Sequence, residues 1–377
     1  MGIELSSEVP QRMEKRKKVE KIIEKLKEKT PGMHLGFGAA FNTVYIPTPF
    51  VTLNNLNNGG IPRGKFGVIA GPAQTAKSTL LAQAIGYNMQ NDPNFVALWT
   101  DAENSIEPEW METLGVDLNR LIIQRYTENQ MSMEQLLDSG LELIRSKAVD
   151  IWIVDSIGAL VPKAEANKMI EENAMLDVQR KLGQFFRKAN TIICPDVDWP
   201  GCACVFIGQI YNVPTTTGVG LEEVRGGNAV KHWAHWRWKT RRGNKDEGPE
   251  EIMVKFPDGN SGKIRPGWAL HVKEDKSKIN EKESQQIILQ FVHGRGLDST
   301  NSAITALIAN EIIERDGAMY KHPKLPDGKV RGRDNLIKFL QDNKELREEL
   351  IKEMDVFLAE RQLDQGNESQ DNIQESI

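Results

Sequence analysis

A stretch of eight residues combines a backbone loop, a lysine and a hydroxyl in the order that phosphate binding requires. It reads Gly71-Pro72-Ala73-Gln74-Thr75-Ala76-Lys77-Ser78 and is followed by Thr79. In such a loop, successive backbone N–H groups converge on a polyphosphate, the lysine reaches the β- and γ-phosphates, and the Ser or Thr hydroxyl ligates Mg²⁺. The stretch predicts a nucleotide-binding loop in which Lys77 contacts phosphate and Ser78 contacts phosphate and metal.

One position in this loop departs from the usual pattern. Ala76 stands where a glycine normally precedes the lysine. If the backbone angle φ is negative at this position, alanine is tolerated; if φ is positive, alanine is strained. We therefore expect nucleotide binding with an altered rate of hydrolysis.

The segments on either side supply the elements that such a loop needs. An apolar run at 66–70 predicts a strand that leads into the loop, and the composition of 79–85 predicts a helix that leads out of it. This arrangement directs backbone donors and the positive end of the helix at the phosphates. The context favours a phosphate-binding loop over a chance Lys-Ser pair at the start of a helix.

Two acidic residues follow predicted strands further along the chain. Glu103 comes after an apolar strand at 95–100, and Asp155 ends a buried strand at 151–155. The carboxyl ends of strands in a doubly wound sheet face the ligand crevice. We expect Asp155 to support Mg²⁺ and Glu103 to orient an attacking water, although Glu103 alone would also suit a helix N-terminus. Trp110 either stacks on a base or belongs to the core.

The composition limits the class of protein. At 377 residues, with 39% hydrophobic and 27% charged residues, the chain is expected to form one large soluble domain with appendages. No apolar run approaches the ~20 residues of a membrane helix, and no secretory signal is recognised, so we expect a cytoplasmic protein without a membrane partner. Three cysteines indicate a reducing compartment; for Cys202 and Cys204, burial in a strand is favoured over a metal site. A net charge of −5 means that nucleic-acid binding must come from local patches.

The two ends of the chain differ from its centre. Residues 10–29 predict a helix in which nine basic and four acidic residues lie between 12 and 29. A solvated helix and a module that docks on a neighbouring subunit are equally consistent with this pattern. The pattern changes after 294–296, and the predicted organisation is an N-terminal helix (1–35), a core (36–293), a small C-terminal domain with short helices (294–362) and an acidic disordered tail (363–377).

Several segments between the strands and helices carry loop or charge patterns. Residues 210–227 form a long segment rich in Gly and Thr, without an apolar period, which is typical of a functional loop or of a disordered one. In 231–242, basic and aromatic residues interleave; a half-buried strand and a nucleic-acid surface both fit. The turn at 257–260 predicts a hairpin between strands at 251–256 and 268–273.

Taken in order, these motifs resemble the RecA family of recombinases over roughly residues 15–350. The resemblance rests on the loop that opens with Gly71-Pro72, on Asp101-Ala102-Glu103, Leu114-Gly115-Val116-Asp117, 149–165, Thr215-Thr216-Thr217-Gly218 and Gly226–Lys231. It implies an α/β fold: a RecA-type P-loop ATPase core with a mainly parallel central sheet, an N-terminal helix and a small C-terminal α/β domain. Ala76 and an added segment near 194–202 look like a phage-encoded, UvsX-like relative, which would act in the cytoplasm of a bacterial host.

The resemblance implies roles for matched positions. Lys77, Glu103 and Gln209 would be catalytic, with Gln209 as the γ-phosphate sensor, and residues 71–79 with Trp110 and Asp155 would bind ATP and Mg²⁺. Residues 163–173 and 210–226 correspond to the two DNA loops, with Tyr211 replacing a basic residue. The DNA-binding positions it implies are Lys163, Lys168, Met169, Arg180, Arg187, Tyr211, Asn212, Thr216, Thr217, Arg225, Gly226, Gly227 and Asn228.

A further group of positions would act between subunits. Lys273, with Lys276 or Lys278, looks like the lysine pair that reaches the ATP of the neighbouring protomer. A one-residue insertion at Glu274-Asp275 leaves the second lysine open. The N-terminal helix would dock on the adjacent protomer.

The implied function is that of an ATP-dependent homologous DNA recombinase. It would form a helical filament on single-stranded DNA, exchange strands with homologous duplex DNA, and work with single-strand-binding and loader proteins. The alternative is a ring motor of the same fold, such as a replicative helicase; such motors usually supply an arginine from the neighbour, whereas the candidates here are lysines. A DNA-coating protein without activity is disfavoured by Glu103 together with Asp155.

Overall fold

The computed structural model describes most of the chain. The described residues are 8–26, 43–126, 132–163, 175–196, 198–213, 221–224, 227–249, 251–255, 261–280 and 284–358. Over these ranges, no helix combines the length and the apolar composition that crossing a bilayer requires.

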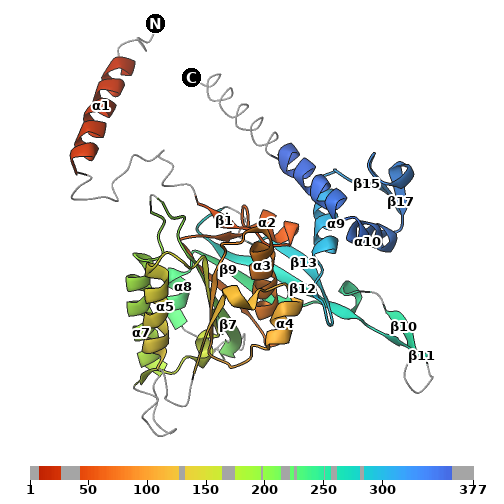
Figure 1. The fold of residues 1–377 in the computed structure, drawn as a ribbon, viewed down its shortest axis with the longest axis horizontal. Helices are drawn as coiled ribbons and strands as arrows, with labels where there is room; N and C mark the ends of the chain where they lie inside the picture. Colours follow the sequence, from red (N-terminus) through yellow and green to blue (C-terminus); the bar gives the residue numbers. More distant parts are fainter. Residues whose placement is uncertain are drawn as a thin grey trace.

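A ten-stranded mixed sheet forms the centre of the molecule (Figure 1). From edge to edge its strands are β14 (Gly296–Leu297), β13 (Gln286–Val292), β12 (Gly267–Ser277), β9 (Trp236–Arg242), β3 (Phe66–Gly71), β7 (Ala203–Val213), β6 (Ile151–Asp155), β4 (Ala97–Asp101) and β5 (Leu121–Arg125), with β8 (Leu221–Val224) paired to β7. The six strands from β9 to β5 are parallel, and β12 to β14 extend them antiparallel. The predicted α/β class with a mainly parallel sheet is confirmed.

Helices cover both faces of this sheet. One hydrophobic cluster joins it to the helices α2 (Val51–Leu56), α3 (Lys77–Asn91) and α4 (Pro108–Thr113). A second cluster joins its other face to the helices α5 (Met133–Arg145), α7 (Met175–Asn190) and α8 (Gly227–Trp233). Because β6 is buried on both sides, alternate residues enter the two clusters: Ile151 and Ile153 the first, Trp152 and Val154 the second.

Close packing of α5 on the sheet depends on one glycine. A Cβ on Gly140 would lie 2.4 Å from the indole of Trp152, so any side chain at this position would push the helix away from β6. The N-terminus of α5 is set by a capping box between Ser132 and Gln135. These contacts help to place the carboxyl end of β6, and therefore Asp155, at the edge of the sheet where the site lies.

Two features of the second half of the core differ from the prediction. Residues 210–213 and 221–224 are not irregular: β7 and β8 pair antiparallel, with Tyr211 opposite Glu223. The predicted hairpin is wrong in its partner, because β10 (Ile252–Lys255) pairs with β11 (Ser261–Ile264), while 268–273 belongs to β12 between β9 and β13. The sequence of the turn at 257–260 is compatible with a hairpin to either segment. Residues 268–273 are not the partner because they pair with β9 and β13 in the central sheet.

The basic and aromatic segment at 231–242 is mainly structural. It divides between the end of α8 and the strand β9. Trp236 and Trp238 are fully buried with ring centroids 4.4 Å apart, and Trp233 stacks on Phe186. The half-buried strand is therefore confirmed for β9, and these indoles are not available to stack on nucleic-acid bases. Cys202 and Cys204 are buried as predicted.

The terminal regions add smaller units. A third hydrophobic cluster contains α9 (Ser299–Ala309), α10 (Arg333–Asp342) and the helical residues 344–358, with β15 (Glu314–Asp316), β16 (Met319–Lys321) and β17 (Lys329–Arg331) forming a small sheet. A two-stranded pair, β1 (Tyr45–Ile46) and β2 (Ile61–Pro62), precedes the core. The helix α1 (Glu8–Leu26) lies away from the sheet in Figure 1. The division into four parts stays a prediction, and the tail at 363–377 lies outside the described residues.

Candidate nucleotide-binding site

The predicted phosphate loop joins β3 to α3, as its sequence context requires. Thr240 of the neighbouring strand β9 holds the loop by hydrogen bonds. Its Oγ1 lies 2.8 Å from Thr75 Oγ1 and 3.3 Å from the carbonyl oxygen of Ala70. A Cβ on Gly71 would lie 2.0 Å from the same Thr240 hydroxyl, so only glycine fits at the start of the loop. Thr240 was not predicted, because only the sheet order places β9 beside β3.

Lys77 points into the loop that it follows. Its Nζ donates to the carbonyl oxygens of Pro72 at 2.6 Å and Gly71 at 3.2 Å, and to Thr75 Oγ1 at 3.3 Å. Burial lowers the pKa of Lys77, while the charges of Asp155 and Glu103 act in the opposite direction. The lysine is thus held within the loop by neutral carbonyl oxygens, which a phosphate can displace.

Ser78 and Asp155 meet at the first turn of α3. Ser78 Oγ donates to Asp155 Oδ2 at 2.6 Å. Burial raises the pKa of Asp155 to about 6, helped by the charges of Glu103 and Asp101, although the Ser78 hydrogen bond and Lys77 lower it. The predicted pair of metal-binding oxygens is therefore brought together, next to Lys77.

Ala76 adopts the conformation in which alanine is strained. Its φ is +50° and its ψ is 28°, in the left-handed region. An L-residue in this region costs roughly 1–2 kcal/mol relative to right-handed backbone. The sequence left open whether φ at Ala76 is negative and tolerated or positive and strained, and the structure has the positive, strained conformation.

Glu103 lies beyond the end of β4 and faces the loop. Its Oε1 accepts from Ser156 Oγ at 2.5 Å and from Gln209 Nε2 at 3.4 Å. The first helix after it, α4, begins at Pro108, so Glu103 is not an N-terminal acid of that helix. The turn is held by the buried Asp101, which accepts from the backbone N–H groups of Ser105 and Ile106 and from Arg125. Ser156 was not predicted; its place directly after Asp155 was the only sequence signal.

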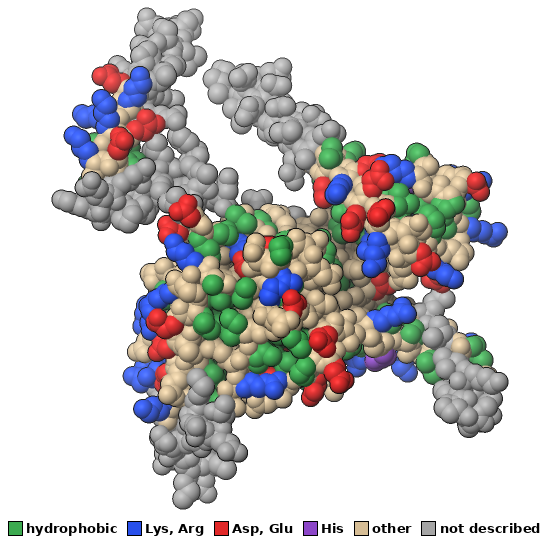
Figure 2. All heavy atoms as spheres, viewed as in Figure 1, with side chains coloured by type: hydrophobic (Ala, Val, Ile, Leu, Met, Phe, Trp, Pro, Cys, Tyr) green, Lys and Arg blue, Asp and Glu red, His purple; other side chains and the backbone are tan. Residues whose placement is uncertain are grey.

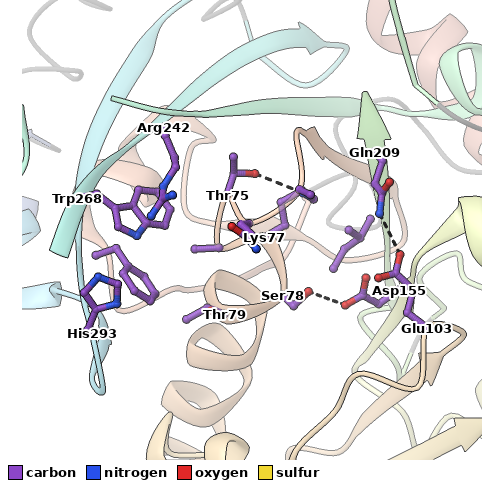
Figure 3. Close-up of a pocket in the computed structure, with 15 residues that line it drawn as sticks. Thr75, Lys77, Ser78, Thr79, Glu103, Asp155, Gln209, Arg242, Trp268 and His293 are labelled. Carbon is purple, nitrogen blue, oxygen red and sulfur yellow. Dashed lines mark hydrogen bonds between the residues drawn. The ribbon is translucent and has the colours of Figure 1, made fainter. Parts of the chain in front are cut away.

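Lys77, Ser78 and the phosphate loop line one cavity of about 540 Å³ together with Glu103, Asp155 and Gln209 (Figure 3). Glu103, Asp155 and Gln209 lie at one end and the phosphate loop in the middle. At the other end is a wall formed by Arg242, Trp268 and His293, with Phe291 stacked on Trp268. Trp110 is not part of this lining, and its ring packs partly buried against the core. The wall was not predicted, because Arg242, Trp268 and Phe291 come from three strands that only the sheet order brings together, and His293 directly follows the third.

Known proteins with similar sequences were found over most of the chain. The sequence model described as the RecA N-terminal domain matches residues 15–260. The chain belongs to the RecA family.

Individual RecA-family relatives support the same assignment. The chain is 30% identical over 314 residues to Protein RecA of Synechocystis sp., covering 83% of this chain and 82% of the relative. It is 29% identical to Protein RecA of Gloeobacter violaceus, over 82% of this chain and 77% of the relative, and 28% identical to Protein RecA of Prochlorococcus marinus, over 89% and 80%. The chain is thus a RecA-type recombinase and a DNA-dependent ATPase, from a family that binds ATP.

In this RecA-family chain, two of the three lysines predicted to act between subunits, Lys273 and Lys276, lie on β12, and Lys278 follows directly after it. The pairing of β12 with β9 shifts register between Glu274 and Lys276, where the insertion was placed. Beyond the shift, Lys276 Nζ donates to the carbonyl oxygen of Lys231 at 2.5 Å and Lys278 Nζ to that of His232 at 3.1 Å. Lys273 lies before the shift, opposite Lys239. None of the three lines the cavity of its own chain.

The DNA-binding positions predicted from RecA proteins lie on several elements. Arg180 and Arg187 are exposed on α7, and Figure 2 shows basic side chains interspersed with acidic ones along the edge where α5 and α7 lie. Lys163 is exposed and Tyr211, on β7, is 40% exposed. Asn212 is the last residue but one of β7, and Gly227 and Asn228 begin α8. The positions outside the described residues are Lys168, Met169, Thr216, Thr217, Arg225 and Gly226.

Proposed function

We propose that this recombinase assembles on single-stranded DNA as an open helical filament, in which ATP bound in the cavity joins neighbouring protomers. The observation that carries the proposal is the convergence of Lys77, Ser78, Asp155, Glu103 and Gln209 in one cavity. Phosphoryl transfer to water needs a phosphate cradle, a metal site and a group that orients water, and this cavity holds candidates for each.

The phosphate loop and Lys77 would bind the triphosphate. Lys77 would leave its carbonyl partners and contact the β- and γ-phosphates. Ser78 and Asp155 fit Mg²⁺, because both offer oxygen ligands and their 2.6 Å separation approaches the about 2.9 Å between neighbouring ligands of an octahedral Mg²⁺ site. When bound, Mg²⁺ would neutralise charge on the β- and γ-phosphates.

Glu103 would orient the water that attacks the γ-phosphate, and Gln209 would sense whether the γ-phosphate is present. The carboxylate of Glu103 would accept a hydrogen bond from the attacking water and orient it. Gln209 contacts Glu103 and lies on β7, which continues directly into the β7–β8 hairpin. A shift of Gln209 towards the γ-phosphate would therefore change the hairpin and couple the nucleotide state to DNA binding.

Contacts between protomers would complete the site. Lys276 and Lys278 are held on carbonyl oxygens of α8 and would approach the ATP of the next protomer. α1 exposes Val19, Ile22 and Leu26, with exposed fractions of 44%, 48% and 36%, and this apolar stripe would dock on a neighbour. Of the two interpretations of α1, we propose the docking module.

DNA would be held mainly through its phosphates. Arg180, Arg187 and Lys163 supply exposed positive charge, and Tyr211 would stack on a base. Such contacts carry little sequence information, so homology would be tested by base pairing with an incoming duplex. We also propose single-strand-binding and loader proteins as partners.

A finer placement within the family rests on two sequence features. We propose that Ala76 and the segment 194–202 mark a phage-encoded, UvsX-like branch, acting in the cytoplasm of a bacterial host. A replicative helicase is not favoured, since relatives matching most of the chain are named Protein RecA.

Electron microscopy with ATP and single-stranded DNA tests the proposed assembly. We expect open helical filaments that require ATP, and ATP hydrolysis stimulated by the DNA. Lys77→Ala should abolish both, while Lys263→Ala, at an exposed position of β11 away from the cavity, should leave both unchanged. Closed rings, or hydrolysis indifferent to DNA, would contradict the proposal.

A further inference from the structure

The backbone that carries Glu103 is held by a side chain that is not part of the cavity lining. Glu103 lies within residues 101–106, which join the end of β4 to the segment before α4 and which we call the catalytic turn. Figure 3 shows its carboxylate directed at Gln209 across the cavity. A displacement of about 1 Å in such a group can lower a rate about a hundredfold. The position of the catalytic turn therefore matters for hydrolysis.

Asp101 closes the catalytic turn from the inside. The residue is fully buried, and its Oδ1 accepts from the N–H of Ser105 at 2.9 Å, while its Oδ2 accepts from the N–H of Ile106 at 3.1 Å. The N–H of Ala102 donates to the carbonyl oxygen of Asp155 at 2.7 Å and so ties the turn to β6. A buried carboxylate of this kind needs a compensating cation.

Arg125 supplies that cation from the neighbouring strand. It ends β5, the edge strand, directly opposite Asp101 of β4. Its Nε donates to Asp101 Oδ2 at 2.9 Å, and its Nη2 donates to the carbonyl oxygen of Ile106 at 2.5 Å. Because the guanidinium is a rigid fork, it holds the first and the last residue of the catalytic turn at a fixed separation. Its side chain is 39% exposed, on the outside of the turn.

We propose that Arg125 is a positioning residue for ATP hydrolysis, which holds both ends of the catalytic turn and thereby fixes the backbone from which Glu103 reaches the attacking water. This inference rests on the proposed function, since it takes Glu103 to orient that water. Ser156 binds one oxygen of the Glu103 carboxylate, whereas Arg125 acts on the backbone behind it. An ion pair with a purely structural role would contribute to stability and leave kcat unchanged.

The chain offers a matched control in Arg120, which directly precedes the other end of β5. Arg120 Nε donates to Asp117 Oδ2 at 2.8 Å, and its terminal nitrogens donate to the carbonyl oxygens of Asp92 and Met89, each at 2.8 Å. Like Arg125, it joins an aspartate to backbone carbonyl oxygens, but it does not contact the catalytic turn. Arg120→Ala therefore removes an arginine of the same kind without moving the proposed water-orienting group.

The test is steady-state ATP hydrolysis by the full chain with Mg²⁺ and single-stranded DNA, with the free energy of unfolding measured for each variant. We expect Arg125→Ala to lower kcat about tenfold and to change KM less than about twofold, because the phosphate loop stays intact. Arg125→Lys keeps a cation beside Asp101 but cannot also span to Ile106, so kcat should fall about threefold. Arg120→Ala should change neither constant by more than about twofold.

Three results would overturn the inference. They are an unchanged kcat in the Arg125 variants, a rise in KM in place of the fall in kcat, or an equal fall in kcat in Arg120→Ala. If Arg125→Ala does not fold, Arg125→Lys decides by the same criteria, since it leaves no buried carboxylate without a cation.

Glu103→Gln separates failure of the inference from failure of the proposed function. If that variant hydrolyses ATP at the unmodified rate, the proposed role of Glu103 is wrong, and the role of Arg125 falls with it. If Glu103→Gln is inactive while both Arg125 variants keep the unmodified kcat, only the role of Arg125 is wrong.

Discussion

Ser78 Oγ and Asp155 Oδ2 are joined by a 2.6 Å hydrogen bond that links the first turn of α3 to the carboxyl end of β6. The bond crosses 77 residues of sequence and joins the phosphate loop to the acidic side of the cavity. Asp155 is buried at this junction, and its raised pKa is a direct consequence. The site therefore contains a carboxyl group that changes charge close to neutral pH.

The pKa of Asp155 predicts a pH-dependent stability. Its pKa is about 6 in the folded protein and near 3.9 in an unfolded chain. Between these values the folded protein holds a proton that the unfolded chain has lost, so this group lowers the free energy of unfolding as pH rises from about 4 to about 6. Asp155→Asn cannot titrate. The unfolding free energy of the unmodified protein minus that of the variant should fall by about 3 kcal/mol over this range.

Urea denaturation without nucleotide, at several pH values between 4 and 7, measures this difference. Taking the difference removes the contributions of other carboxyl groups, such as Glu134 and Glu353, whose lowered pKa values act in the opposite direction. A difference that is constant with pH would contradict the assignment of a buried, protonatable Asp155.

Ala76→Gly should relieve the strain in the phosphate loop. Glycine tolerates a φ of +50° without a steric penalty, but it also makes the unfolded chain more flexible. We expect the free energy of unfolding to rise by up to about 1 kcal/mol, and the ATP affinity and turnover to change, because the methyl group adjoins the phosphate site. The control Ala73→Gly, in the same loop but without positive φ, should not stabilise the protein. Unchanged stability, affinity and turnover in Ala76→Gly would show that Ala76 does not tune the site.

Ser156 should position Glu103 for catalysis. Its buried hydroxyl donates to Glu103 Oε1, which leaves Oε2 to accept from water. We expect Ser156→Ala to lower kcat of ATP hydrolysis about tenfold with little change in KM, and Ser156→Thr to restore part of it. Ser105→Ala is the control, since that hydroxyl makes only a 3.4 Å contact to Asp101 in the same turn. A rise in KM with unchanged kcat would assign Ser156 to nucleotide binding instead.

Lys278 should act on the neighbouring protomer rather than on its own. Glu103→Gln removes the water-orienting group in cis, and Lys278→Ala removes the proposed group in trans. Each variant alone should be inactive. An equal mixture should recover about a quarter of the unmodified rate, because in random filaments one interface in four pairs an intact cavity with an intact lysine. Steady-state ATPase rates of the mixture measure this, and no recovery would place both groups in the same protomer.

Much of the site was predictable because its residues are local in sequence or end a strand. Lys77 and Ser78 follow from the loop, and Asp155 and Glu103 from the apolar strands before them; the structure brings these four together. Thr240, Ser156 and the Arg242 wall were missed because each depends on which strands are neighbours, and strand order is a long-range property. The same cause explains the wrong partner for 251–256.

The conformation of Ala76 and the place of Trp110 illustrate a second limit of predicting a site from sequence. A sequence shows that glycine is absent but does not give φ, so both outcomes at Ala76 stayed open until the loop geometry was known. Trp110 follows the family pattern in sequence and lies on α4, where its ring is partly buried against the core; its stacking on a base stays a prediction. Which aromatic ring lines a cavity depends on side-chain packing, which local sequence does not determine.

Strand exchange tests the central claim most directly. The chain is mixed with ATP, Mg²⁺, a circular single strand and a linear duplex of the same sequence, and joint molecules are resolved by gel electrophoresis. We predict joint molecules that require ATP and homology and that are lost in Lys77→Ala. A chain that hydrolyses ATP in response to single-stranded DNA, yet forms no joint molecules with homologous duplex, would contradict the account.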